Sequence, residues 1–151
     1  MAESLYRQVL DRTVVVLKGE DLRGVRDDEI AVRELPSDGQ ITHAGITVSP
    51  AQEVTDVHTT ERDRIGYPCI ITVNRGSGKD QEDIDPRTEN RRIIRKAFNH
   101  KRAPAETLCG TDARLMPCTA EYGSQQLPER YQENWSENRM VVWFWFLETR
   151  V

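Results

Sequence analysis

The sequence lacks the clusters of cysteine and histidine that would indicate a disulfide framework or a metal site. Its three cysteines, Cys69, Cys109 and Cys118, are odd in number and widely separated, which favours reduced thiols over disulfides. No CxxC pair is present, and the three histidines are scattered rather than spaced as zinc ligands. We therefore expect no metal site and no cofactor.

Catalytic motifs are missing as well. The chain contains no Gly-x-Ser-x-Gly and no His-Glu-x-x-His, the short patterns that mark a serine nucleophile or a zinc protease. The sequence therefore predicts a protein that is not an enzyme. A small enzyme or ligand-binding domain, with a pocket assembled only in space, is the more remote alternative.

The chain has no long hydrophobic run. No stretch approaches the roughly 18–20 apolar residues that span a bilayer. The N-terminal residues Met1 to Ser4 lack the basic and then apolar pattern of a signal peptide. We expect a protein made and kept in a cytosol, without membrane contact.

Charge of one sign is not in large excess. The chain has 21 Lys and Arg against 25 Asp and Glu, a net charge of −4, which disfavours a dedicated nucleic-acid coat. Only 37% of the residues are apolar and 30% are charged, so the core must be economical and the polar surface extensive. With 151 residues, we expect residues 1–151 to form a single domain.

The residue pattern that is present indicates two helices and several strands. Ser4 is expected to cap a helix that ends near Lys18, because apolar residues recur there at helical spacing. A second helix is expected from Asp85, as N-cap, to about His100. Strands are expected at 30–35, at 41–50 (either a strand throughout or a loop followed by a strand), as a pair within 52–75, and within 107–122 with an interruption at Pro117. Polar loops are expected at about 76–85 and 123–138. This order predicts an α+β fold: a mainly antiparallel sheet backed by the two helices.

The strand "RIGYPCIITVNR" (residues 64–75) shows the alternation of a strand with one buried face. Ile70 lies on the opposite face, and Pro68 indicates an edge strand or a bulge. The residues expected to share one face are Ile65, Tyr67, Cys69, Ile71 and Val73.

The densest apolar block is "MVVWFWFL", residues 140–147, almost at the C-terminus. In a strand, Met140, Val142, Phe144 and Phe146 face one way, and Val141, Trp143, Trp145 and Leu147 face the other. Both faces need cover, one from the two helices and the other from a second sheet, a long loop or another copy of the protein. We expect this strand to be central to the sheet.

The segment "GSGKD" invites comparison with a phosphate-binding loop, but the comparison fails. The motif needs Gly five residues before Gly78, where Val73 stands, and Ser or Thr after Lys79, where Asp80 stands. The acids in 80–85 lack the spacing and the Gly of a calcium loop. We interpret 76–85 as an exposed loop, and its residues Gly76, Ser77, Gly78, Lys79 and Asp80 as a candidate contact with a neighbouring subunit or partner.

The second helix concentrates positive charge. Residues 87–102 hold seven Lys and Arg against the single acid Glu89, a local balance of +6. Because Ile93, Ile94, Ala97 and Phe98 occupy the core-facing arc, the bases on the helix cannot all point inward. The candidate interface residues are Arg91, Arg92, Arg95 and Lys96; they face an acidic protein partner, a DNA backbone, or only solvent.

The order of these elements resembles the tail terminator and tail-completion proteins of long-tailed bacteriophages. The likeness lies in the N-terminal amphipathic helix, "GITVSP" (45–50), "RDRIGYPCIITVNRG" (62–76), "RRIIRKAF" (91–98) and "VVWFWFLETR" (141–150), without a diagnostic motif. It implies a small α+β protein that forms a ring, commonly a hexamer, on the end of the tail tube.

The resemblance carries expectations about role, partners and place. It implies a structural protein of the virion tail or neck that terminates tail growth and contributes to head–tail joining. Its expected partners are other copies of itself, the tail tube protein and the head–tail connector proteins, with genomic DNA passing nearby; before incorporation it would reside in the host cytoplasm. A head–tail connector (stopper) or another minor tail subunit is the alternative, and a DNA-binding regulator is disfavoured because no helix-turn-helix pattern is present.

Overall fold

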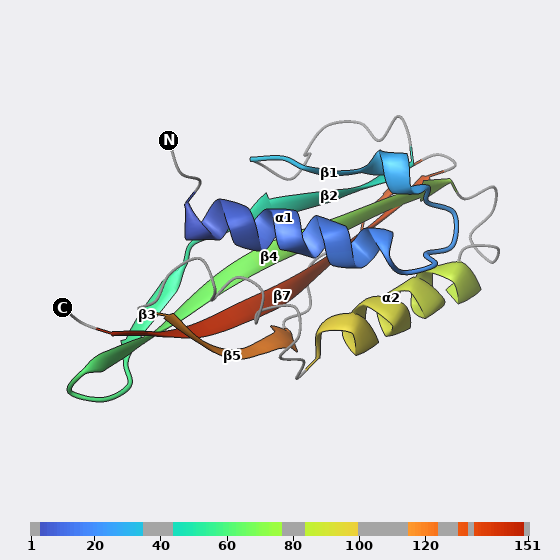
Figure 1. Ribbon diagram of the computed structural model, residues 1–151. Coiled ribbons are helices and arrows are strands. Elements are labelled where there is room, and N and C mark those ends of the chain that lie inside the picture. The colour runs from blue at the N-terminus through green and yellow to red at the C-terminus, as the bar shows by residue number, and fades with distance from the viewer. Residues whose placement is uncertain are drawn as a thin grey trace.

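The α+β fold expected from the sequence is confirmed by the computed structural model (Figure 1). The model describes residues 4–34, 44–76, 84–99, 115–123, 130–132 and 135–149. Their elements are α1 (Leu5–Lys18), a 3-10 helix η1 (Asp27–Glu29), β1 (Ile30–Val32), β2 (Gly45–Pro50), β3 (Val54–Val57), β4 (Arg62–Gly76), α2 (Ile84–Phe98), β5 (Leu115–Tyr122), β6 (Arg130–Gln132) and β7 (Trp135–Thr149).

The strands form one seven-stranded sheet built around two long central strands. Its order is β1-β2-β4-β7-β5, with β3 paired to β4 and β6 paired to β7. Only β1 and β2 pair in parallel; every other pairing is antiparallel. Strands β4 and β7 stay in register over their full length, from Arg62 opposite Thr149 to Gly76 opposite Trp135. The prediction that the terminal strand is central to the sheet is therefore confirmed.

Helix α1 begins and ends where the sequence predicts. The backbone N–H of Arg7 donates to the Ser4 hydroxyl oxygen at 3.2 Å, which caps the first turn, and the helix ends at Lys18 before Gly19. Its buried residues, Val9, Leu10, Thr13 and Leu17, recur at helical spacing.

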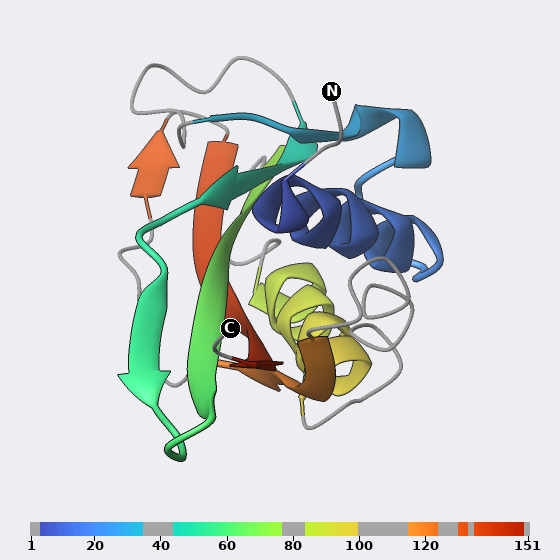
Figure 2. The ribbon, with the colours of Figure 1, turned by 60° about the vertical axis from the view of Figure 1, so that its left-hand side comes forward.

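Both helices cover the same face of the sheet, with α1 over β1, β2 and β4 and α2 over β5 and β7 (Figure 2). The apolar core lies between the helices and this face, and the odd-numbered residues expected from β4 enter it, with Tyr67 only partly buried. Its buried members include Val9, Leu10, Leu17, Ile46, Val48, Cys69, Ile71, Val73, Ile94, Phe98, Met140, Val142, Phe144 and Phe146.

A group of polar contacts holds α2 against the rest of the molecule. The Asn90 side chain accepts from the backbone N–H of Arg23 at 2.8 Å and donates to the Arg23 carbonyl oxygen at 2.9 Å. Nε of Arg75 donates to the same carbonyl oxygen at 3.0 Å. The neighbouring Gly24 has φ of +78°, and a Cβ on it would lie 2.7 Å from Nε of Arg75. The α1–β1 connection, β4 and α2 are thus joined at one buried point.

Four boundaries expected from the sequence are wrong. Gly76 is the last residue of β4 rather than the first of a loop, and α2 begins at Ile84, one residue before the expected cap Asp85. The expected polar loop 123–138 contains β6 and the start of β7, because Ser136, Glu137 and Asn138 are buried polar residues of the long central strand. Strand β1 is also shorter than expected, ending at Val32.

Pro68 lies in an interior strand, but at a gap in the pairing on one side of that strand. There β2 ends with Pro50 opposite Cys69, and β3 starts with Val54 opposite Gly66, so β4 is an edge locally at Pro68. The Tyr6 hydroxyl fills this interruption, since it accepts from the Ala51 N–H at 2.8 Å and contacts the carbonyl oxygens of Ala51 and Pro68. On the other side of β7, the interruption expected at Pro117 is confirmed as a register shift in β5.

Candidate interaction surfaces

The face of the sheet opposite the helices has no helix over it in the described part of the chain (Figure 2). Strand pairing arranges its side chains in rows, because directly opposed residues share a face. From one end to the other, β4 and β7 contribute Asn74 with Glu137, Thr72 with Arg139, Ile70 with Val141, Pro68 with Trp143, Gly66 with Trp145, and Arg64 with Leu147. The face therefore changes from polar at one end to aromatic at the other.

The aromatic end, which we call the aromatic face, comprises Val54, Arg64, Glu121, Trp143, Trp145 and Leu147. The two indole rings are stacked, with centroids 5.4 Å apart and planes inclined by 13°. The Arg64 guanidinium carbon lies 3.8 Å from the Trp145 ring centroid, and the indole N–H donates to Glu121 at 3.1 Å. Each tryptophan nevertheless remains partly exposed. The expected two-faced strand is confirmed, and only one of its faces is covered by the helices.

Gly66 permits this aromatic arrangement. A Cβ on Gly66 would lie 2.4 Å from Cζ3 and 2.7 Å from Cη2 of Trp145, so the indole ring rests directly on the glycine backbone. The ring is also held by its neighbours Trp143, Arg64 and Glu121. The aromatic face is thus a fixed surface rather than a set of loose side chains.

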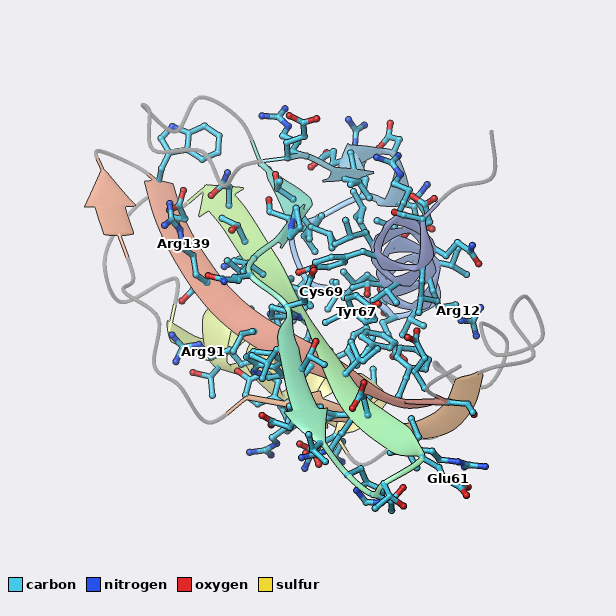
Figure 3. The ribbon with its side chains drawn as sticks, turned by 90° about the vertical axis from the view of Figure 1, so that its left-hand side faces the viewer. Arg12, Glu61, Tyr67, Cys69, Arg91 and Arg139 are labelled. Carbon is cyan, nitrogen blue, oxygen red and sulfur yellow. The ribbon has the colours of Figure 1, made fainter. Side chains whose placement is uncertain are left out.

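The polar end of the same face is closely packed. Glu137 is 1% exposed, and its carboxylate accepts from Nε of Arg139 at 3.0 Å. Thr72, opposite Arg139, and Ser49, opposite Ile70, are buried on the same face, and their hydroxyl oxygens have no hydrogen-bond partner among the described residues. Figure 3 shows Arg139 and Glu61 toward opposite ends of the sheet. Exposed apolar surface is therefore concentrated at the aromatic end.

The candidate residues on α2 divide into two groups. Arg91 is partly buried, and its guanidinium donates to the Asn138 side chain at 3.0 Å, so this base helps to hold α2 on the sheet. Arg92, Arg95 and Lys96 are exposed on the outer side of the helix, and we call them the basic face. Arg92 forms an ion pair with Glu89 at 2.7 Å. Neither Arg95 nor Lys96 forms an ion pair within the described residues.

The ion pair between Arg92 and Glu89 shifts the pKa of both of these side chains. The hydrogen bond from Arg92 lowers the pKa of Glu89 and raises the pKa of Arg92. Both charges stay in place at neutral pH, and the basic face keeps its positive sign. Of the expected loop contacts, Gly76 ends β4, and Ser77, Gly78, Lys79 and Asp80 lie outside the described residues.

The reactive side chain Cys69, on the helix side of the sheet, is part of the packed core. Burial raises the pKa of the Cys69 thiol to about 12, which keeps it protonated, and the Thr13 hydroxyl lies 3.6 Å from its sulfur. Figure 3 shows Cys69 and Tyr67 between the sheet and α1. In the described ranges, no three His, Cys, Asp or Glu residues lie together as metal ligands would.

A groove of about 240 Å³ lies between the start of α1 and the ends of β1 and β2. Its lining includes Tyr6, Arg33 and Glu34, and also Ser4, whose hydroxyl already caps α1. Among the described residues that line it, none is a histidine or a cysteine. The sheet face and the basic face are the stronger candidates for function.

Neither of the two described helices is long and apolar enough to cross a membrane. No protein-family model matches the sequence, and no curated protein matches it either.

Proposed function

We propose that this protein is a structural virion protein that forms a ring on the end of a phage tail tube. The ring terminates tail growth and contributes to head–tail joining, in the host cytoplasm during assembly and in the tail or neck of the finished virion. The protein is not an enzyme in this proposal. Its partners are other copies of itself, in a hexamer as the resemblance implies, the tail tube protein and the head–tail connector proteins.

The observation that carries the proposal is the half-exposed aromatic face. A central strand with large apolar side chains on both sides needs cover on both sides, and contiguous exposed apolar surface marks an interaction site. Trp143 and Trp145 are also of the residue type enriched where protein partners bind most tightly. A protein that completes its burial in an assembly leaves such a face open in the isolated subunit.

The basic face of α2 supports the same class of function. Exposed bases at a subunit surface give attraction to acidic protein partners and, near a channel, to the backbone of passing DNA. Aromatic residues do not alternate with these bases along α2, so stacking on single-stranded nucleic acid is disfavoured.

Electron microscopy of particles assembled with and without the protein tests the role. We expect its removal to give tails of irregular and excessive length without joined heads, and resupply of the protein to restore uniform tails. Tails of normal length without joined heads would assign it instead to the connector (stopper) position. Normal particles in its absence would contradict the proposal.

A further inference from the structure

The two sides of the sheet differ in a way that constrains how copies can meet. One side carries α1 and α2, while the opposite side carries the aromatic face. A two-fold dimer joins the same patch on both subunits, whereas a ring with more members joins two different patches head to tail. The inference below rests on the proposed ring, and asks which two patches those are.

The first patch is acidic and lies beside the aromatic face. Residues 51–61, which we call the acidic hairpin, contain Glu53, Asp56 and Glu61 and no Lys or Arg, and every residue in this range is exposed. Val54 is 38% exposed and Val57 is 77% exposed. Val54 and Asp56 pair with Gly66 and Arg64, which places their side chains on the same face as Trp145.

Backbone hydrogen bonds hold the turn of the acidic hairpin in one conformation. Its turn is closed by the N–H groups of His58 and Thr59, which donate to the Arg62 carbonyl oxygen at 3.1 and 3.0 Å. Residues 51–64 contain four acids, Glu53, Asp56, Glu61 and Asp63, against Arg62 and Arg64, and with Glu121 the region has a net charge of −3. Arg64 of the same chain lies over the Trp145 ring, so this guanidinium is part of the patch.

The second patch is the basic face, Arg92, Arg95 and Lys96, on the outer side of α2. It lies on the opposite side of the sheet from the aromatic face (Figure 2). The two patches therefore point away from each other, have opposite charge, and cannot meet within one chain. Arg95 and Lys96 need to give up no ion pair with the described residues in order to bind elsewhere.

We infer that the basic face of one copy docks on the acidic hairpin and aromatic face of the next copy. The contact places a helix over the side of the sheet on which no described helix lies, so both faces of the central strands become covered. Opposite charges orient the two copies and set the head-to-tail order. In a closed ring, the basic face of each copy binds one neighbour, and its acidic hairpin and aromatic face bind the other neighbour.

Charge reversal on the two patches tests the inference. Variant A carries Glu53→Lys, Asp56→Lys and Glu61→Lys; variant B carries Arg92→Glu, Arg95→Glu and Lys96→Glu. A matched control carries Asp21→Lys, Asp27→Lys and Asp28→Lys, three exposed acids outside both patches. Oligomer mass is measured by sedimentation, and folding by circular dichroism and thermal unfolding.

Each of variants A and B alone should lose the oligomer while remaining folded, and the control should assemble like the wild type. A mixture of A and B should regain an oligomer in which the two variants alternate. The basic hairpin of A then meets the acidic helix of B, and the acidic hairpin of B meets the basic helix of A. A single chain carrying all six substitutions should also reassemble. Mass spectrometry of the mixed oligomer should show equal numbers of the two variants.

Assembly of A or B alone as in the wild type would overturn the inference, and so would a folded mixture that stays dissociated. If A or B unfolds by itself, the chain that carries all six substitutions becomes the deciding sample. Its failure to assemble would overturn the inference. These outcomes are distinct from a failure of the proposed function. If the wild type assembles and terminates tails while A and B do the same, the function stands and this interface is wrong.

Discussion

The two faces of β7 have similar residues and different surroundings. On the helix side, Met140 is 3% exposed, and Val142, Phe144 and Phe146 are each 0% exposed. On the other side, Val141 is 4% exposed, but Trp143, Trp145 and Leu147 remain partly exposed despite their size. The chain thus completes burial of one face by itself and leaves the other incomplete. The comparison separates two tasks of one strand: the helix side stabilises the subunit, and the aromatic side is available to a partner.

Replacement of Phe144 by Ala should have the largest effect on stability. Truncation of a fully buried aromatic side chain costs about 3–5 kcal/mol in the free energy of unfolding. Trp145→Ala, on the partly exposed side, should cost less in folding and more in assembly. Urea unfolding and sedimentation of both variants check this, and equal losses of stability would remove the distinction between the two faces.

Asn90→Ala should break the polar contacts that hold α2. It removes two partly buried hydrogen bonds, although the Arg23 carbonyl oxygen still accepts from Arg75, and a hydrogen bond of this kind contributes about 1 kcal/mol to the free energy of unfolding. Asn99 is exposed, so Asn99→Ala removes the same kind of side chain from the surface and is the matched control. Hydrogen exchange should show faster exchange in α2 for Asn90→Ala alone. If both variants behave alike, this contact is not what fixes the helix.

The sequence predicted the parts of the fold that depend on apolar periodicity. The core sides of α1, β4 and β7 are correct because one buried face imposes a period of 3.6 or 2 on the residues. The start of β7 was missed because Ser136, Glu137 and Asn138 look like loop residues. They are buried in the strand because polar groups distant in sequence, such as Arg91, reach them.

The candidate interaction surfaces were predicted only in part, because they also depend on contacts between residues that are distant in sequence. The basic helix and the two-faced strand could be recognised locally, and three of the four bases singled out on α2 are exposed. That Arg91 turns to the sheet depends on Asn138, 47 residues away. The hairpin acids beside the tryptophans depend on strand register, which brings Val54 and Trp145 to the two sides of Gly66. No periodicity within a single segment contains that information.

Gly66→Ala tests whether the aromatic face is a fixed surface. The new Cβ would overlap the Trp145 ring, and such overpacking costs about 1–3 kcal/mol when neighbours prevent the ring from moving. Tryptophan fluorescence should shift as well. In a double-mutant cycle, Gly66→Ala should cost far less in a Trp145→Ala background. An equal cost in both backgrounds would place the strain elsewhere.

The stability of the isolated subunit should fall at alkaline pH. Burial raises the pKa of Cys69 to about 12 from an ordinary value of 9.0, so between these values the unfolded chain binds fewer protons than the folded protein. The free energy of unfolding then decreases with rising pH, by about 1 kcal/mol per pH unit for this thiol. Burial also raises the pKa of Tyr6 and Tyr67, which adds to the decrease above their ordinary value of 10.0.

Cys69→Ala separates the thiol from the tyrosines. Urea unfolding between about pH 8 and pH 10 should show a shallower pH dependence in this variant than in the wild type, because the thiol no longer contributes to proton linkage. The other two cysteines are present in both proteins and cancel in the comparison. Identical slopes would mean that Cys69 is accessible to water in the folded state.

The central claim is that the partly exposed aromatic face serves self-association. Sedimentation equilibrium of the wild-type protein over a wide range of concentration tests this claim most directly. The account predicts one closed oligomer, with a mass that is a fixed multiple of the 17.4 kDa subunit and does not grow further as concentration rises. It also predicts that Trp145→Ala shifts the protein toward the single subunit. A folded wild-type protein that remains a 17.4 kDa monomer at every concentration would contradict it.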